Sequence, residues 1–187
     1  MNKLFITANE LLLDSFRLAR QVIESGFRPD IIVGVWRGGA PVGIAVQEYF
    51  AYLDHDCDHI AIRTSSYYGI DEQREVRVLG MQYLVENFSP DQSILLVDDV
   101  FDSGRSVEAI LASLTEQLGV DISARVKIAC PWYKPSRNKT TILPDYYLHQ
   151  TDAWLVFPHE IVGLTAEEIA DGKPELSQLL AHQYLED

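Results

Sequence analysis

One short stretch of the sequence, Ile94 to Ser106, places three carboxylates next to a small polar turn. Asp98 and Asp99 end an apolar run, Asp102 follows, and residues 103–106 read Ser-Gly-Arg-Ser. The backbone amides and hydroxyls of such a turn can surround a phosphate, and its glycine allows the dihedral angles that this requires. Because like charges repel, Asp98 and Asp99 suit sugar hydroxyls or a Mg²⁺ ion rather than that phosphate. Asp102 then remains to accept a proton.

Other motifs with phosphate-binding or acidic residues fit this stretch less well. A P-loop requires glycine at the position of Asp99 and lysine at that of Arg105, and G-x-G-x-x-G occurs nowhere in the chain. A receiver domain has acidic residues after strands but no use for the following Ser-Gly-Arg-Ser. A helix cap needs only one of the three carboxylates. A combined sugar and phosphate site is therefore the interpretation that we favour.

Strands and helices alternate along the chain and would position this turn. Thr7-x-x-Glu10 predicts the start of a helix that ends near Gly26, and Pro41 begins a second helix to about Leu53. Helices are also expected at about 106–118 and, with an interruption, from 167 onward. Short apolar runs predict strands at 30–36, 60–63, 93–97, 126–130, 146–149 and 153–156. This order predicts an α/β fold with a central, mainly parallel sheet flanked by helices and ligands at the carboxyl ends of the strands.

Composition narrows the classes of function. The 187 residues include 28 acidic and 15 basic side chains, a net charge of -13 that disfavours nucleic-acid binding. No apolar run approaches the ~20 residues that span a bilayer. Two cysteines make no disulfide framework, so we expect a cytoplasmic location. The cluster from His55 to His59 has metal-ligand types, but its place in a polar connection favours an ordinary surface turn.

The stretch from Val97 to Ser106 resembles the signature with which type I phosphoribosyltransferases bind 5-phosphoribosyl 1-pyrophosphate (PRPP). The resemblance implies the fold of that family, with a small C-terminal base-binding hood. It also implies that Asp98 and Asp99 hold the ribose hydroxyls and Mg²⁺. The residues implied for the 5-phosphate are Ser103, Gly104, Arg105 and Ser106. The residues that match the family's pyrophosphate loop are Trp36, Arg37, Gly38 and Gly39, with a non-proline cis peptide bond expected between the first two.

Three regions resemble bacterial xanthine-guanine phosphoribosyltransferases. Asp102 matches the aspartate of enzymes that act on 6-oxopurines, where a carboxylate can take the imidazole proton of the base. The polar stretch from Thr64 to about Arg77 is similar to their mobile loop, although alone it would indicate only a solvated hairpin. Its implied residues are Ser65, Ser66, Tyr67 and Arg74. In the third region, Lys134 would donate to the purine O6, Trp154 would stack on the ring, and the backbone around Leu155 would contact the 2-substituent.

The expected function is transfer of the phosphoribosyl group from PRPP to N9 of guanine, xanthine or hypoxanthine, with Mg²⁺ as cofactor. The alternative is a non-catalytic regulator of the same fold that senses PRPP or a nucleotide. We expect a single domain over residues 1–187, with base-binding elements at about 131–160 and a helical extension at 161–187. Glu160 would hold a second Mg²⁺, act as a cap or face solvent. We expect the chain to form a homodimer or homotetramer. We expect neither a nucleic-acid partner nor a membrane-spanning segment.

Overall fold

The computed structural model describes residues 3–68, 74–119 and 121–181. The chain divides into two compact units, a larger one of residues 9–152 and a smaller one of residues 1–8 with 153–187. The expected base-binding region at 131–160 is thus shared between them, with 131–152 in the larger unit and 153–160 in the smaller. The hood and extension boundaries remain predictions.

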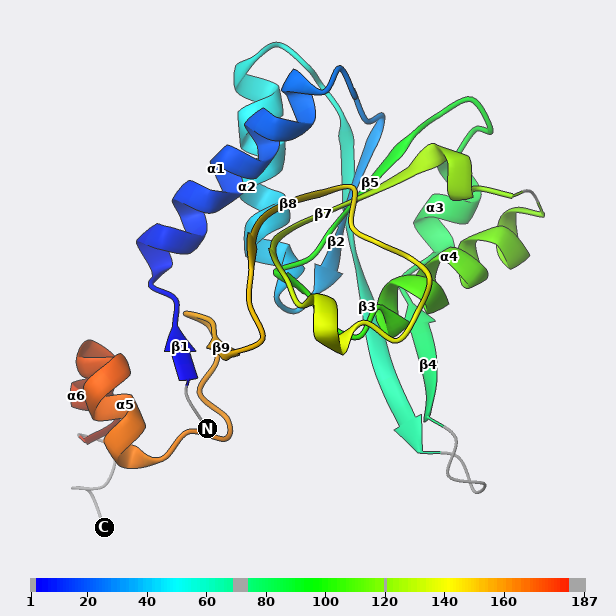
Figure 1. The fold of residues 1–187 in the computed structure, drawn as a ribbon. Coiled ribbons are helices and arrows are strands. Elements are labelled where there is room, and N and C mark those ends of the chain that lie inside the picture. Colours follow the sequence, from blue (N-terminus) through cyan, green and yellow to red (C-terminus); the bar gives the residue numbers. More distant parts are fainter. Residues whose placement is uncertain (1–2, 69–73, 120, 182–187) are drawn as a thin grey trace. The chain divides into compact units, whose positions relative to one another are not determined.

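The larger unit contains the central sheet and its helices (Figure 1). Its helices are α1 (Ala8–Glu24), α2 (Gly39–Tyr52), α3 (Gln82–Asn87) and α4 (Arg105–Leu118), with short 3₁₀ turns η1 (Ser123–Arg125) and η2 (Pro135–Arg137). Its strands are β2 (Ile31–Trp36), β3 (Asp58–Tyr68), β4 (Arg74–Leu79), β5 (Ile94–Val97), β6 (Val100–Phe101), β7 (Val126–Tyr133) and β8 (Tyr146–Gln150). The predicted α/β class is confirmed.

The strands follow the order β4-β3-β2-β5-β7-β6, and β8 also pairs with β7. β3 and β4 are antiparallel, whereas the remaining pairs are parallel. The register aligns Gly34 of β2 with Val97 of β5, and Val97 with Ala129 of β7. The carboxyl ends of these three strands therefore meet at one edge of the sheet, where the predicted site residues follow β2 and β5.

Both faces of the central strands are covered, α1 and α2 lying on one side of the sheet and α3 and α4 on the other (Figure 1). Every residue of β5 is buried, as is every residue of β2 except its last. Side chains of β2, β5 and β7 pack with Val107, Ile110 and Leu114 of α4 in one hydrophobic cluster. This explains why both strands are nearly continuous apolar runs rather than alternating ones.

The stretch from Thr64 to Arg77, expected as a loop after a short strand, is mostly strand. The backbone of β3 continues to Tyr68, β4 begins at Arg74, and the pairs include Ser65 with Arg77. The polar composition concealed this extension, because antiparallel pairing satisfies the backbone groups whatever the side chains are. Residues 69–73, the centre of the predicted mobile loop, lie outside the described residues.

In the smaller unit, β1 (Lys3–Phe5) pairs in parallel with β9 (Trp154–Val156), and α5 (Ala166–Gly172) and α6 (Pro174–Ala181) follow. Thr165 begins α5 with a capping box to Glu168, which also pairs with Lys3 at 2.6 Å. The Glu160 carboxylate accepts a hydrogen bond from the amide of Phe157 (3.0 Å). Of the three expected alternatives for Glu160, this hydrogen bond supports the cap. No described helix is both long and apolar enough to cross a membrane.

Candidate active site

The turn formed by residues 103–106, here called the phosphate turn, connects β6 to α4. Gly104 has φ +77°, a conformation that side-chain-bearing residues rarely adopt, and α4 begins at the next residue. A Cβ at this position would lie 2.5 Å from the Thr140 hydroxyl oxygen. The turn and its neighbours enclose a small hollow of about 80 Å³. This space can admit a tetrahedral anion at the positive end of α4, as the sequence predicted.

Asp98 and Asp99 directly follow β5, and the surroundings of their two carboxylates differ. The Asp98 carboxylate accepts hydrogen bonds from the backbone amides of Asp99 (3.0 Å) and Gly39. Burial and the neighbouring charge of Asp99 raise the pKa of Asp98 well above its ordinary value. Asp99 is itself buried, at 8% relative exposure. Because the amide of Gly39 belongs to the first turn of α2, Asp98 links the end of β5 to the start of that helix.

The two glycines of the pyrophosphate loop, Gly38 and Gly39, lie directly against the chain at Asp98 and Asp99. The peptide bond between Trp36 and Arg37 is cis, as expected from the family resemblance. A Cβ on Gly38 would lie 1.8 Å from a carboxylate oxygen of Asp99, and one on Gly39 would lie 2.3 Å from the carbonyl oxygen of Val97. The two glycines are therefore required so that the loop can approach the end of β5. α2 begins at Gly39, two residues before the expected Pro41.

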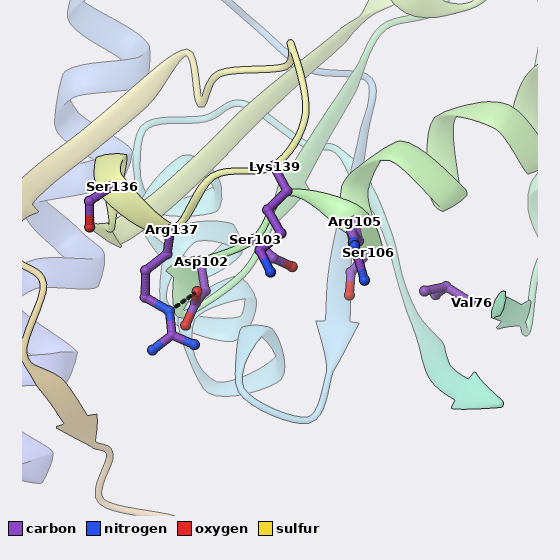
Figure 2. Close-up of a pocket in the computed structure, with 8 residues that line it drawn as sticks. All are labelled: Val76, Asp102, Ser103, Arg105, Ser106, Ser136, Arg137 and Lys139. Atoms are coloured by element: carbon purple, nitrogen blue, oxygen red, sulfur yellow. Dashed lines mark ion pairs between the residues drawn. The ribbon is translucent and has the colours of Figure 1, made fainter. Parts of the chain in front are cut away.

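Asp102 lies between two cations. The Lys134 ammonium is 3.4 Å from Oδ2 of Asp102. Nε of Arg137 is 2.8 Å from Oδ1, and Figure 2 shows this second pair. Lys134 is buried at the end of β7, and its amide donates to the carbonyl oxygen of Phe101 (2.9 Å). Arg137 is half-exposed, so its contribution to this pair is weakened by solvent, as for exposed pairs worth about 0–1 kcal/mol.

Asp102 and Arg137 border an open cleft of about 560 Å³. Asp102 and the phosphate turn form one part of the wall, the segment after β7 forms another, and Val76 of β4 contributes from the hairpin (Figure 2). The full lining is Val76, Asp102, Ser103, Arg105, Ser106, Ser136, Arg137 and Lys139. The β3–β4 hairpin, which contains the predicted mobile loop, thus reaches this cleft through Val76 of β4.

The structure brings together most of the predicted residues of the larger unit. The proposed PRPP-binding residues, the pyrophosphate loop, Asp102 and Lys134 meet at the carboxyl edge of the sheet. Ser65, Ser66, Tyr67 and Arg74 lie on the strands of the hairpin, and their assignment to a mobile loop stays a prediction. Trp154, which is half-exposed, and Leu155, which is buried, lie on β9 of the smaller unit. Their role in base binding also stays a prediction.

Sequence reasoning missed Arg137 and Lys139. Both follow β7 by a few residues and carry positive charges to a cleft whose predicted residues come from the link between β6 and α4 and from the start of α4. The available signal was the spacing of Lys134 and Arg137, three residues apart in a chain with few cations. That spacing alone does not distinguish a site from a solvated surface.

The donor set at the end of β5 suits a magnesium ion that is shared with a substrate. Mg²⁺ commonly binds one or two carboxylates, keeps several waters and takes its remaining oxygens from substrate phosphates. Asp98 and Asp99 supply two adjacent carboxylates, one of them with a raised pKa caused by burial and by its neighbour. Within the described ranges, no cluster of three or more acidic, histidine or cysteine side chains could hold a metal ion alone.

Known proteins similar to this chain include a protein family and several solved structures. Residues 6–161 match the family of the phosphoribosyl transferase domain. A purine phosphoribosyltransferase of Pyrococcus horikoshii is 28% identical, with 88% of this chain and 99% of that chain covered and a TM-score of 0.67. The xanthine-guanine-hypoxanthine phosphoribosyltransferase of Helicobacter pylori shares the fold at 22% identity (97% and 100% covered, TM-score 0.69). The bifunctional protein PyrR of Pasteurella multocida is 27% identical over 124 residues, which are 62% of this chain and 67% of that protein.

Proposed function

The chain belongs to the phosphoribosyltransferase family and has its type I fold, and we propose that it transfers the phosphoribosyl group of PRPP to N9 of a 6-oxopurine. The observation that carries this proposal is the pairing of Asp102 with the buried Lys134 beside the phosphate turn. A 6-oxopurine presents an acceptor at O6 and a proton on its imidazole ring. An ammonium and a carboxylate side by side can engage both at once.

The proposed reaction breaks the bond between C1′ and the pyrophosphate oxygen and forms the bond from N9 to C1′. The electron pair leaves with pyrophosphate, and the imidazole proton passes to Asp102. Arg37 and the amides of the pyrophosphate loop would stabilise the leaving charge. Asp98 and Asp99 would hold Mg²⁺, and the ion would supply positive charge that neutralises part of the phosphate charge. The phosphate turn holds the 5-phosphate in place.

Lys134 supports the choice of a 6-oxopurine over adenine. Adenine carries an amino group in place of O6, so the ammonium of Lys134 would face a second donor. A buried donor without an acceptor costs about 1–3 kcal/mol, and more for a charged group. Asp102 must release Arg137 before one of its oxygens can meet the base. That release costs little because Arg137 is half-exposed.

The test is incubation with PRPP, Mg²⁺ and each of guanine, xanthine, hypoxanthine, adenine, uracil and orotate, with pyrophosphate release as the readout. Release with at least one 6-oxopurine and little with adenine is the expected result. Turnover only with a pyrimidine would overturn the base assignment. No turnover with any base, despite tight binding of PRPP or a nucleotide, would favour the second candidate function, a nucleotide-sensing regulator. The likeness to a protein named bifunctional gives that candidate its support.

A further inference from the structure

We propose that Lys139 binds the 5-phosphate of the sugar substrate, as a cation supplied from outside the phosphate turn. This inference rests on the proposed function and adds a residue to its phosphate site. Lys139 lies in the segment that follows η2, more than thirty residues after the turn along the chain. It lines the same cleft as Ser103 and Ser106, the two hydroxyl residues of the turn (Figure 2).

The backbone of this segment is fastened to the phosphate turn. The amide of Lys139 donates to the carbonyl oxygen of Ser103 at 3.0 Å. The Asn138 side-chain oxygen accepts from both the amide (3.0 Å) and the hydroxyl (3.1 Å) of Thr140, and its Nδ2 donates to the carbonyl oxygen of Ile142 (2.8 Å). A Cβ on Gly104 would come within 2.5–2.8 Å of Thr140 and Asn138, so the two segments are in close contact. The backbone of Lys139 is therefore held beside the turn by one main-chain hydrogen bond and by the packing of Asn138 and Thr140 against Gly104.

The charges around the cleft favour an anionic ligand. Arg105, Arg137 and Lys139 line it, and the single carboxylate among its described lining residues is that of Asp102, which is already paired. Among the described residues, neither Lys139 nor Arg105 makes an ion pair. The chain as a whole carries a net charge of -13, so this local excess of positive charge differs from the rest of the molecule.

The identity of the phosphate follows from the other groups in the wall. Ser103 and Ser106 belong to the turn that surrounds the hollow at the start of α4, whereas no residue of the pyrophosphate loop lines this cleft among the described residues. Lys139 therefore faces the phosphate ester at C5 of the sugar rather than the pyrophosphate at C1. Because the ammonium is exposed, its attraction is screened by salt.

The test compares wild type, Lys139→Met, Lys139→Arg and the control Lys127→Met for binding of ribose 5-phosphate by calorimetry at low ionic strength. Lys127 lies at the start of β7, whereas Lys139 follows the end of that strand. Lys127→Met therefore removes the same charge from the chain at a distant position. Lys139→Met should weaken binding about tenfold, as expected for a charge-assisted contact at an exposed position, while Lys139→Arg and Lys127→Met stay near wild type. In turnover, the KM for PRPP should rise with kcat nearly unchanged.

The outcomes separate this inference from the proposed function. If wild type binds neither ribose 5-phosphate nor PRPP, the proposed function fails. If wild type binds and Lys139→Met binds equally well, only the role of Lys139 fails. An affinity loss that persists unchanged at 1 M salt would show a structural effect and would also overturn it. Should Lys139→Met fold poorly by circular dichroism, Lys139→Gln takes its place, with the same expected loss.

Discussion

Replacing Gly39 by alanine tests whether the approach of the pyrophosphate loop to β5 is as close as the structure shows. The added Cβ would lie 2.3 Å from the carbonyl oxygen of Val97 and 2.9 Å from Cα of Asp98. Both are backbone atoms at the end of a buried strand, so no side chain can rotate to relieve the overlap. To reach an ordinary contact of 3.4 Å, the start of α2 must move by about 1.1 Å.

The expected cost of this movement follows from overpacking of a buried site, about 1–3 kcal/mol in the free energy of unfolding. At about 2–4 °C per kcal/mol for a chain of this size, the Tm should fall measurably. The same shift separates the loop from Asp98 and Asp99. A misplacement of about 1 Å can lower turnover by about 10²-fold. Thermal unfolding and PRPP-dependent pyrophosphate release measure the two effects.

Gly43, one turn further along α2, provides the matched control. A Cβ there would meet only Cα of Gly34 at 3.6 Å, an ordinary contact. Gly43→Ala should therefore be neutral or stabilise the helix by up to about 1 kcal/mol, with normal turnover. The reasoning is refuted if Gly39→Ala keeps the wild-type Tm and a kcat/KM within threefold of wild type. Equal losses in both variants would show that α2 tolerates no substitution, which would also remove the argument.

Further predictions concern the charged and thiol groups. Asp102→Asn should lower kcat by about 10²–10⁴-fold while nucleotide binding persists, and unchanged turnover would remove its role as proton acceptor. Lys134→Ala should raise the KM for the purine, and an effect confined to the KM for PRPP would contradict its placement at the base. Burial and the charge of Asp99 raise the pKa of Asp98, so the folded chain holds this proton more tightly than the unfolded chain. Without Mg²⁺, the free energy of unfolding should therefore fall as the pH rises above about 4, and the fall should end once Asp98 ionises in the folded chain. Urea titrations of Asp98→Asn at several pH values should lack this slope. Equal slopes in the variant and in wild type would refute the prediction. Burial, together with the charges of Asp56 and Asp58, raises the pKa of Cys57 to about 11. This thiol should therefore resist thiol reagents at pH 8 until the chain unfolds, because the thiolate is the reactive form. Rapid labelling of Cys57 in the folded chain would contradict this prediction.

The sequence alone predicted the α/β class and the residues of the phosphate turn. The turn is local, since its amides, hydroxyls and glycine lie within four consecutive residues, and the apolar run before it is long enough to indicate a buried strand. The full length of the hairpin's strands was missed because β3 and β4 are stabilised by pairing with each other rather than by a hydrophobic pattern. Polar residues can occupy a strand when its partner satisfies the backbone.

Only the tertiary structure decided which distant residues meet at this turn. The register of β2 with β5 places Gly38 and Gly39 against Asp98 and Asp99. The path of the chain after β7 places Arg137 against Asp102 and fastens Lys139 to Ser103; these last two contacts have no periodic signal in the sequence. The physical reason is that such contacts depend on how strands align and how a loop returns to the sheet. Local propensity fixes an element's type but not its neighbours in space.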